Sequence, residues 1–297
     1  MSLPLYVLAV DLGGTNFRLA WVNRQGEIAH RATYKSPPSP ALFYQELHSA
    51  LAQGPPVAAL GLGLAGPVSQ GRFLSPANLP WGVVPVEQDL TRLVGLPLAL
   101  GNDATLAAWG EACFGAGKGI SDFVMLTLGT GIGGGAVLGG RLFAGSRGLA
   151  MEVGHLALGP EDAPCGCGLK GHWEASCSGT GLARQARALG VEAATAKELF
   201  DLAATTPLVQ ELIAANARLL GRGLAGLVHL FDPALLVFGG SLAHQEALYL
   251  APALAEMETQ LLPAFQGQVQ AAQAQLGDDA GLLGAAALAW GILPPLA

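Results

Sequence analysis

Two glycine-rich loops in this sequence combine residue types that can bind a phosphate group. The first covers residues 11–16, Asp-Leu-Gly-Gly-Thr-Asn, and the second covers residues 129–135, Gly-Thr-Gly-Ile-Gly-Gly-Gly. Glycine lets the backbone approach a phosphate closely, so that main-chain N–H groups can converge on its oxygens. The first loop taken alone fits an ordinary hairpin turn equally well, whereas the second contains more glycine than a turn requires. We interpret both as phosphate-binding loops.

A third glycine pair and a carboxylate extend this phosphate site. The pair follows an apolar run at residues 234–238, and Asp11 can hold Mg²⁺ through its water shell. The second loop matches the spacing of a dinucleotide fingerprint, but a strand-like run follows it instead of a helix, and the P-loop pattern occurs nowhere in the sequence. The residues that we expect to contact a nucleotide are Asp11, Gly13, Gly14, Thr15, Asn16, Thr130, Gly131, Gly133, Gly239 and Gly240.

Four side chains typical of a zinc site lie within eighteen residues of one another. They are His155, Cys165, Cys167 and His172. Four nitrogen and sulfur ligands with no spare position suit a closed, tetrahedral, structural Zn²⁺ site. A buried thiol or an ordinary histidine would explain each residue singly, but not the four together. Two cysteines separated by one residue also favour metal binding in a reducing compartment over a disulfide scaffold, so we expect a cytoplasmic protein.

A carboxylate that could act as a general base stands at Asp103. It follows an apolar run at residues 96–100 and precedes a probable helix at 104–114. A hydroxyl group is a weak nucleophile, so its phosphorylation needs a nearby carboxylate to accept the proton. The position taken alone favours a second explanation, in which Asp103 caps the helix N-terminus.

Composition excludes two classes of partner. The chain has 297 residues, of which 51% are hydrophobic and 12% charged, with a formal net charge of −7. That balance provides no basic stripe for a nucleic-acid backbone. The apolar residues 1–10 lack the basic start of a secretory signal, and glycine and proline interrupt the uncharged segment 281–297. We therefore expect no nucleic-acid partner and no membrane association, and the length favours two domains.

The elements that must position these residues show a repeated pattern. Strand, glycine turn and strand occur first at residues 5–23 and again at 123–142, which implies two related halves facing one another. Helical and apolar runs alternate between and after them, which indicates an α/β fold. The other elements that we expect are helices at 41–53, 208–230 and 282–291 and a strand at 234–238, with a short apolar run at 57–64.

Motifs along almost the whole chain resemble the ROK family of repressors, open reading frames and sugar kinases. The matching segments are residues 11–16, 63–68, 101–104, 128–135, 152–155, 165–174 and 238–241. The resemblance implies a two-domain α/β fold of the actin-like ATPase (ribonuclease-H-like) type, with the active site in a cleft between the domains. We expect a small domain from residues 1–105 plus 283–297 and a large domain, with the zinc knuckle, from 106–282.

The same resemblance assigns roles in a sugar site. It implies Asn102 as a sugar ligand and Asp103 as the base, and it adds Asn78 to the pocket, although an Asx turn before proline explains Asn78 as well. Hexose hydroxyls need donors and acceptors around the ring, which Glu152, His155 and Glu174 would supply. Residues 165–174 depart from the family signature once, because His172 stands where the third cysteine is usual.

The function implied is that of an ATP-dependent hexose kinase acting on the 6-hydroxyl of glucose. Mannose, fructose and N-acetylated amino sugars stay open as substrates, as does polyphosphate as the donor. Two other functions stay open. One is a sugar-sensing repressor without its DNA-binding segment, and the other is a non-catalytic sugar-binding scaffold. Lysine and arginine have no evident place in the scheme, so Mg²⁺ and backbone dipoles would neutralise the phosphates. We expect a homodimer or homotetramer.

Overall fold

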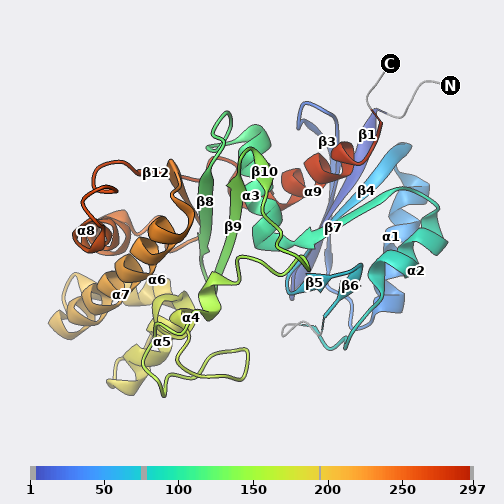
Figure 1. The fold of residues 1–297 in the computed structure, drawn as a ribbon. Helices are drawn as coiled ribbons and strands as arrows, with labels where there is room; N and C mark the ends of the chain where they lie inside the picture. Colours follow the sequence, from blue (N-terminus) through green and yellow to red (C-terminus); the bar gives the residue numbers. More distant parts are fainter. Residues whose placement is uncertain (1–4, 75–78, 194, 295–297) are drawn as a thin grey trace.

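Two five-stranded mixed sheets form the framework of the protein (Figure 1). The computed structural model describes residues 5–74, 79–193 and 195–294. The first sheet has the order β3-β2-β1-β4-β7 and the second the order β10-β9-β8-β11-β12. In each sheet an antiparallel hairpin is extended on one side by parallel strands. The shared topology agrees with the repeated pattern in the sequence.

The first sheet carries the first glycine loop between its two hairpin strands. Its strands are β1 (Tyr6–Leu12), β2 (Asn16–Val22), β3 (Ile28–Lys35), β4 (Val57–Leu64) and β7 (Leu98–Asn102). Side chains alternate between its faces. On one face Leu8 and Val10 pack in a core with α1 (Pro40–Gln53) and α2 (Val86–Val94), and on the other Val7 and Ala9 pack against α9 (Ala280–Gly291).

The second sheet carries the second and third glycine segments. Its strands are β8 (Phe123–Leu128), β9 (Ile132–Leu138), β10 (Arg141–Leu142), β11 (Leu235–Gly239) and β12 (Gln270–Gln273). The predicted turn at 129–135 followed by a strand at 136–142 is wrong, because β9 begins at Ile132. An ideal Cβ at Gly133 would lie 2.7 Å from the Ala104 Cβ, and one at Gly135 would lie 2.5 Å from the Ala108 Cβ. These glycines are strand residues that let a helix pack closely.

Two helices lie between the sheets and cross at glycines (Figure 1). Helix α3 (Asp103–Phe114) packs on β9, α9 packs on β1 and β4, and the two helices pack on each other. At the crossing, a Cβ on Gly284 would lie 1.7 Å from the Leu106 carbonyl oxygen, and one on Gly110 would lie 2.3 Å from the Ala280 carbonyl oxygen. Both halves of the molecule therefore meet at a contact between helix backbones.

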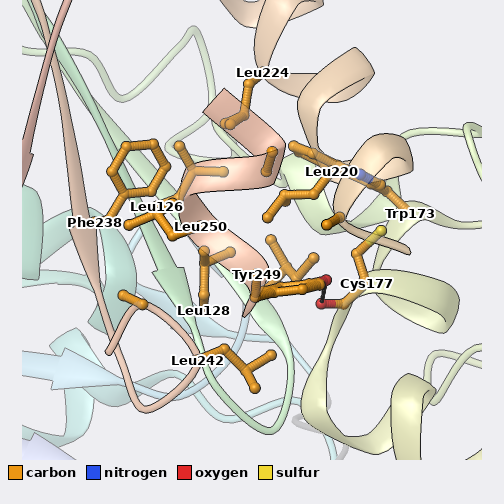
Figure 2. Packing of buried hydrophobic residues seen from close by; sticks show 14 of the residues in the cluster. Leu126, Leu128, Trp173, Cys177, Leu220, Leu224, Phe238, Leu242, Tyr249 and Leu250 are labelled. Atoms are coloured by element: carbon orange, nitrogen blue, oxygen red, sulfur yellow. Dashed lines mark hydrogen bonds between the residues drawn. The ribbon is translucent and has the colours of Figure 1, made fainter. Parts of the chain in front are cut away.

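The remaining helices cover the second sheet and enclose its core. They are α4 (Trp173–Cys177), α5 (Gly179–Ala188), α6 (Ala196–Ala203), α7 (Pro207–Phe231) and α8 (Ala251–Gln260), with short helical turns at Val153–His155 and Glu246–Leu250. Another short turn, Gly277–Asp279, leads into α9, and a small hairpin of β5 (Val68–Ser69) and β6 (Arg72–Phe73) packs in the core of the first sheet. Figure 2 shows Trp173 and Tyr249 in this core, where the Tyr249 hydroxyl donates to the Cys177 carbonyl oxygen at 2.6 Å. Burying side chains this large anchors α4, which begins directly after His172. Within the described residues, no helix is both long and apolar enough to span a bilayer.

Candidate active site

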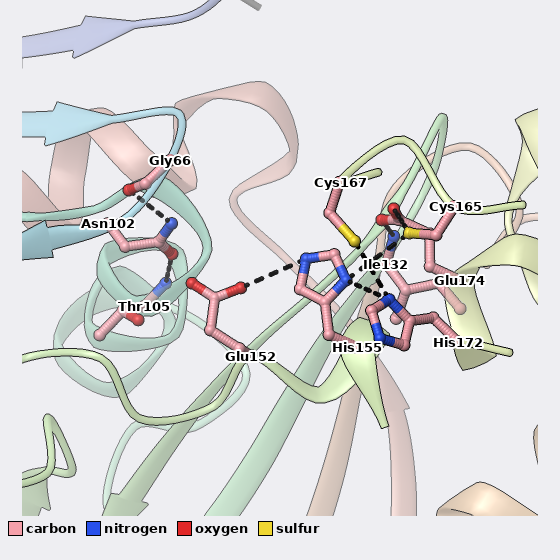
Figure 3. A network of polar contacts seen from close by, with 10 residues as sticks. All are labelled: Gly66, Asn102, Thr105, Ile132, Glu152, His155, Cys165, Cys167, His172 and Glu174. Atoms are coloured by element: carbon pink, nitrogen blue, oxygen red, sulfur yellow. Dashed lines mark hydrogen bonds and ion pairs between the residues drawn. The ribbon is translucent and has the colours of Figure 1, made fainter. Parts of the chain in front are cut away.

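Asn102, and not Asp103, caps helix α3. The Asn102 Oδ1 accepts the Thr105 N–H at 3.1 Å, and its Nδ2 donates to the Gly66 carbonyl oxygen at 3.2 Å (Figure 3). Asp103 is the first residue of the helix, and its Oδ1 accepts the N–H of Ala104 at 2.9 Å. The cap explanation for Asp103 is therefore wrong, because its neighbour performs that role. Asn102, which the family resemblance implies as a sugar ligand, therefore uses its side-chain amide in the helix cap and in the bond to Gly66.

Asp103 is a buried carboxylate with an altered acidity. Its pKa is raised from 3.8 to about 6, chiefly by burial and also by the negative charges of Asp11 and Glu152, whereas the hydrogen bond from the Ala104 N–H acts in the opposite direction. The structure thus brings together three carboxylates that lie far apart in the sequence. A carboxylate with this pKa is mostly ionised at neutral pH and can accept a proton.

Asp11 lies at the end of β1 and is paired with Arg18. The two residues are direct cross-strand partners in the β1–β2 hairpin. The Arg18 Nε donates to the Asp11 Oδ2 at 3.1 Å, and Nη2 contacts the same oxygen. A Cβ at Gly281 in α9 would lie 3.8 Å from the Asp11 Cγ and 3.9 Å from the Asp103 carbonyl oxygen. Asp11, Asp103 and the start of α9 therefore surround one small volume.

The first glycine loop is a tight exposed turn that is held from behind. The Gly13 N–H donates to the Asn16 carbonyl oxygen at 3.0 Å, and Gly14, Thr15 and Asn16 are exposed. Ser36 fixes the loop. Its hydroxyl donates to the Gly13 carbonyl oxygen at 2.6 Å, and its N–H donates to the Thr15 carbonyl oxygen at 3.0 Å. Sequence reasoning missed Ser36, since it is one polar residue in a proline-rich stretch with no signal of its own.

The second glycine loop is reduced to residues 129–131 and rests on the start of α5. The N–H of Gly179 donates to the Gly129 carbonyl oxygen at 2.8 Å, and that of Thr180 donates to Thr130 at 3.2 Å. Within the loop, the Gly129 N–H donates to the Gly131 carbonyl oxygen at 3.0 Å. Thr130 itself is exposed.

The third glycine segment lies beside the second loop. Strands β8 and β11 are parallel, so Leu128 and Gly239 end at the same edge of the sheet. Gly240 has φ of 86°, and a Cβ there would lie 2.4 Å from the Leu128 carbonyl oxygen. Glycine is required at this position both for its backbone conformation and for the close approach. The glycines at 239 and 240 thus join the edge that carries the second loop.

The four predicted zinc ligands form one cluster (Figure 3). The His155 Nδ1 lies 3.2 Å from the His172 Nδ1 and 3.7 Å from the Cys165 Sγ, and the Cys167 Sγ lies 3.2 Å from the His172 Nδ1. All four ligand atoms lie within 4.8 Å of one another. A tetrahedral zinc with bonds of about 2.0–2.3 Å has ligand atoms about 3.3–3.8 Å apart. The residues present therefore fit Zn²⁺, with His172 in the place of the usual cysteine.

A small hairpin presents the two cysteines to this cluster. The Cys165 N–H donates to the Leu169 carbonyl oxygen at 2.9 Å, and the Gly168 N–H donates back to Cys165 at 3.1 Å. Gly168 has φ of 90°, which favours glycine at the turn. The chain then passes His172 and enters α4, whose buried Trp173 fixes the direction of the next residue, Glu174.

Glu174 connects the metal cluster to the second glycine loop. Its Oε2 accepts the Ile132 N–H at 2.8 Å, and its Oε1 accepts from the Cys165 thiol at 3.6 Å. A Cβ on Gly131 would lie 2.4 Å from the Glu174 Oε2, so glycine at 131 makes room for this carboxylate. The sequence placed Glu174 on the sugar, and that role stays a prediction. In the structure, Glu174 links Cys165, in the hairpin that carries the two cysteines, to Ile132, directly after the second glycine loop.

The two ring nitrogens of His155 face different groups. Nδ1 faces the other predicted metal ligands, while Nε2 lies 3.9 Å from the Glu152 Oε2. Burial raises the pKa of Glu152, which also lies near enough to Asp103 to affect it. Glu152 and His155 thus lie between the metal cluster and the candidate base. Asn78, the remaining predicted sugar ligand, lies outside the described residues.

The chain is similar to several sugar kinases over almost its whole length. Glucokinase of Streptomyces coelicolor is 35% identical over 95% of this chain and 96% of its own length. N-acetylmannosamine kinase of Shigella flexneri is 37% identical over 96% of this chain and 98% of its own length. The crystal structure of a ROK family glucokinase from Streptomyces griseus, in complex with glucose and AMPPNP, superposes with a TM-score of 0.80 at 34% identity, covering 96% of this chain and 99% of that one.

The family itself is identified by a profile that spans nearly the whole sequence. The ROK family profile matches residues 7–291. The structural match confirms the predicted two-domain α/β fold of the actin-like ATPase type. The chain therefore belongs to the ROK family.

Proposed function

We propose that this protein is an ATP-dependent glucokinase, which transfers the γ-phosphoryl group of ATP to the 6-hydroxyl of glucose. The observation that carries the proposal is Asp103, a buried carboxylate with a pKa of about 6 beside Asp11. Such a group is ionised at neutral pH and can accept the proton of a hydroxyl as that hydroxyl attacks phosphorus. The similarity to glucokinases of two Streptomyces species supports glucose as the acceptor.

The glycine segments of both sheets would bind the nucleotide. The N–H groups of residues 14–15 and 130–131 would supply donors for phosphate oxygens, and Gly239 and Gly240 border the second loop. When bound, Mg²⁺ neutralises charge that develops on the transferring group. Asp11 would hold it, since both contacts from Arg18 fall on Oδ2 and no described residue donates to Oδ1. Closure of the two halves would exclude water and limit hydrolysis of ATP.

The sugar would lie between Asp103 and the zinc knuckle. Glu152 and the Nε2 side of His155 face this region, and Asn78, Asn102 and Glu174 complete the expected set. A structural Zn²⁺ held by His155, Cys165, Cys167 and His172 would fix the orientation of the His155 ring. The metal would thus shape the sugar pocket while the chemistry proceeds elsewhere.

One relative favours a second substrate. N-acetylmannosamine kinase of Shigella flexneri is 37% identical over 96% of the chain, slightly more than the 35% over 95% of the glucokinase of Streptomyces coelicolor. A kinase acting on an N-acetylated amino sugar is therefore the second candidate. We also propose a cytoplasmic homodimer or homotetramer whose small domain comprises residues 1–105 plus 283–297 and whose large domain comprises 106–282.

The proposal is tested by a coupled assay of ADP release with ATP and Mg²⁺. Glucose, mannose, fructose, N-acetylglucosamine and N-acetylmannosamine are compared for wild type and Asp103→Asn. We expect the highest kcat/KM with glucose and a loss of at least about 100-fold in the variant, the effect of removing a general base. Higher activity with N-acetylmannosamine would select the second candidate. Activity that survives Asp103→Asn unchanged would contradict the assignment of the base.

A further inference from the structure

One buried residue beside the candidate sugar site has a left-handed backbone. Three non-glycine residues in the described part of the chain have positive φ, namely Gln70, Met151 and Asp232. Gln70 lies in the tight turn between β5 and β6, Asp232 ends α7, and both are exposed. Met151, with φ of 69°, is only 8% exposed. This conformation is unfavourable for a residue with a Cβ, so it persists only where the surrounding structure imposes it.

Contacts with β9 and with the core hold Met151 in this conformation. Its side chain packs in the core of the second half. A Cβ on Gly134 would lie 3.0 Å from the Met151 carbonyl oxygen and 2.7 Å from a Val153 methyl group. A Cβ on Gly154 would lie 2.3 Å from the Ile132 carbonyl oxygen. The segment is therefore packed against β9 at two glycines, which leaves its backbone little freedom to change.

Met151 directly precedes Glu152, a side chain that we expect to bind the sugar. Met151 and Val153 are both buried, whereas the side chain of Glu152 between them is 43% exposed. The Glu152 carboxylate lies 3.9 Å from the His155 Nε2 (Figure 3), and its charge affects Asp103. A negative φ at Met151 would turn the following chain in another direction. Glu152 would then leave its place between His155 and Asp103.

We propose that the left-handed backbone of Met151 positions Glu152 and His155 for the sugar, and that burial of the Met151 side chain offsets the cost of this conformation. The proposal rests on the proposed kinase function. Met151 is a positioning residue, which acts through Glu152 and not through a contact of its own with a substrate. Glycine adopts positive φ freely, unbranched residues adopt it at a cost, and residues branched at Cβ adopt it least readily. Substitutions can therefore separate the effect of the backbone from that of the side chain.

Steady-state kinetics of Met151→Ile and Met151→Leu test this role, because the two new side chains are isomers that differ in branching at Cβ. We expect Met151→Ile to raise KM for glucose about 10-fold, as for the loss of one charge-assisted hydrogen bond, and to leave KM for ATP unchanged. Met151→Leu should recover most of this loss. Met151→Gly should have a lower Tm but a glucose KM close to that of wild type, because glycine keeps the conformation while the buried side chain is lost.

Two further variants and a control make the test specific. Met151→Pro excludes the left-handed conformation, since proline fixes φ at about −65°, and should raise the glucose KM at least as much as Met151→Ile. In a Glu152→Gln background, Met151→Ile should have little further effect, because the two residues act as a unit. The matched control is Asp232→Ile, which branches a left-handed residue before β11, at the end of that strand opposite Gly239. It should lower the Tm without changing either KM.

The pattern of KM values separates positioning from general damage to the fold. An unchanged glucose KM in both Met151→Ile and Met151→Pro would overturn the inference, as would equal increases in KM for glucose and for ATP. A glucose KM raised as much by Met151→Gly as by Met151→Ile would assign the effect to the side chain, which also overturns it. If Met151→Pro does not fold, the comparison of Met151→Ile with Met151→Leu decides. If wild type itself phosphorylates none of the five sugars, it is the kinase function that fails.

Discussion

At the scale of single residues, the acidity of the proposed base, Asp103, should set how activity depends on pH. A base must be ionised, so kcat/KM should rise with pH and reach a plateau above the pKa of this group. Because burial and neighbouring carboxylates raise that pKa to about 6, we expect the acid limb of the profile near pH 6, well above the value of 3.8 for an ordinary aspartate. Initial rates with saturating ATP and limiting glucose, measured from pH 5 to 9, test this. An acid limb below pH 4.5 would contradict it.

The same carboxylate is expected to destabilise the folded protein at neutral pH. Its pKa is higher in the folded chain than in the unfolded one, so folding is favoured when it is protonated and that contribution is lost as pH rises from about 4 to 6. A difference of about 2 units corresponds to roughly 3 kcal/mol as an upper limit. Asp103→Asn retains an oxygen that can accept the Ala104 N–H. We expect the variant to be inactive yet more stable by about 1–3 kcal/mol at pH 8.

Urea unfolding of wild type and Asp103→Asn at pH 8 and at pH 5 provides the measurement. The gain in the free energy of unfolding should be smaller at pH 5, where the wild-type carboxylate is largely protonated. An equal difference at both pH values would mean that the effect of the substitution does not arise from ionisation.

The candidate residues could be recognised from the sequence better than their contacts could. The four predicted zinc ligands lie in one cluster, and Asp11 and Asp103 lie near each other, because each motif is a local pattern with a demanding chemistry. Arg18 was missed although a two-residue turn fixes it opposite Asp11, and Ser36 was missed because its bonds to the first loop cross 20 or so residues of chain. Contacts of that kind depend on how strands and loops meet in space.

At the scale of elements, the crossing of α3 and α9 determines how the two sheets are joined. A Cβ on Gly284 would lie 1.7 Å from the Leu106 carbonyl oxygen, which no side-chain movement can relieve. We expect Gly284→Ala to destabilise the protein by more than about 3 kcal/mol and to lower the yield of folded protein. The control is Gly226→Ala in α7, where no atom lies within 4 Å of the added Cβ, so it should be neutral or stabilising by up to about 1 kcal/mol.

Thermal unfolding of both variants beside wild type measures the effect. A Tm for Gly284→Ala within a degree or two of that of Gly226→Ala would show that the helices can separate at little cost. Steady-state kinetics of the folded Gly284→Ala protein would then show whether the altered helix crossing also affects the proposed closure of the two halves.

Elements were predictable where hydrophobic periodicity was long and local. The helix expected at 208–230 is α7 (Pro207–Phe231), the strand expected at 234–238 is β11 (Leu235–Gly239), and the apolar run at 57–64 forms β4 (Val57–Leu64). The run at 129–135 was assigned wholly to a turn because glycine indicates flexibility when its neighbours are unknown. Its last three glycines lie in a strand, where α3 and Val153 leave no space for a Cβ. The reason for these glycines is tertiary packing, which a local pattern does not reveal.

At the scale of the whole molecule, the cluster of proposed zinc ligands links the proposed sugar and nucleotide regions of the second half. His155 faces Glu152 with one nitrogen and the cluster with the other, and Glu174 joins Cys165 to the start of β9 after the second glycine loop. A disturbance at the cluster should therefore reach both the sugar and the nucleotide sites. We therefore expect that removing the metal would weaken binding of both substrates as well as disorder the residues around the cluster.

We expect one zinc ion per chain, lost in Cys167→Ser and retained in Cys113→Ser, whose thiol lies in α3 away from the cluster. Loss of zinc should lower the Tm and raise KM for both substrates, because a structural zinc site contributes folding free energy and orients its ligands. His172→Cys should keep the metal, since a thiolate suits the same tetrahedral site. Elemental analysis after dialysis against a chelator, with Tm and KM for each variant, distinguishes these outcomes. Normal zinc content in Cys167→Ser would remove Cys167 from the ligand set, whereas zinc loss with an unchanged KM for ATP would mean that Glu174 does not transmit the effect to the loop.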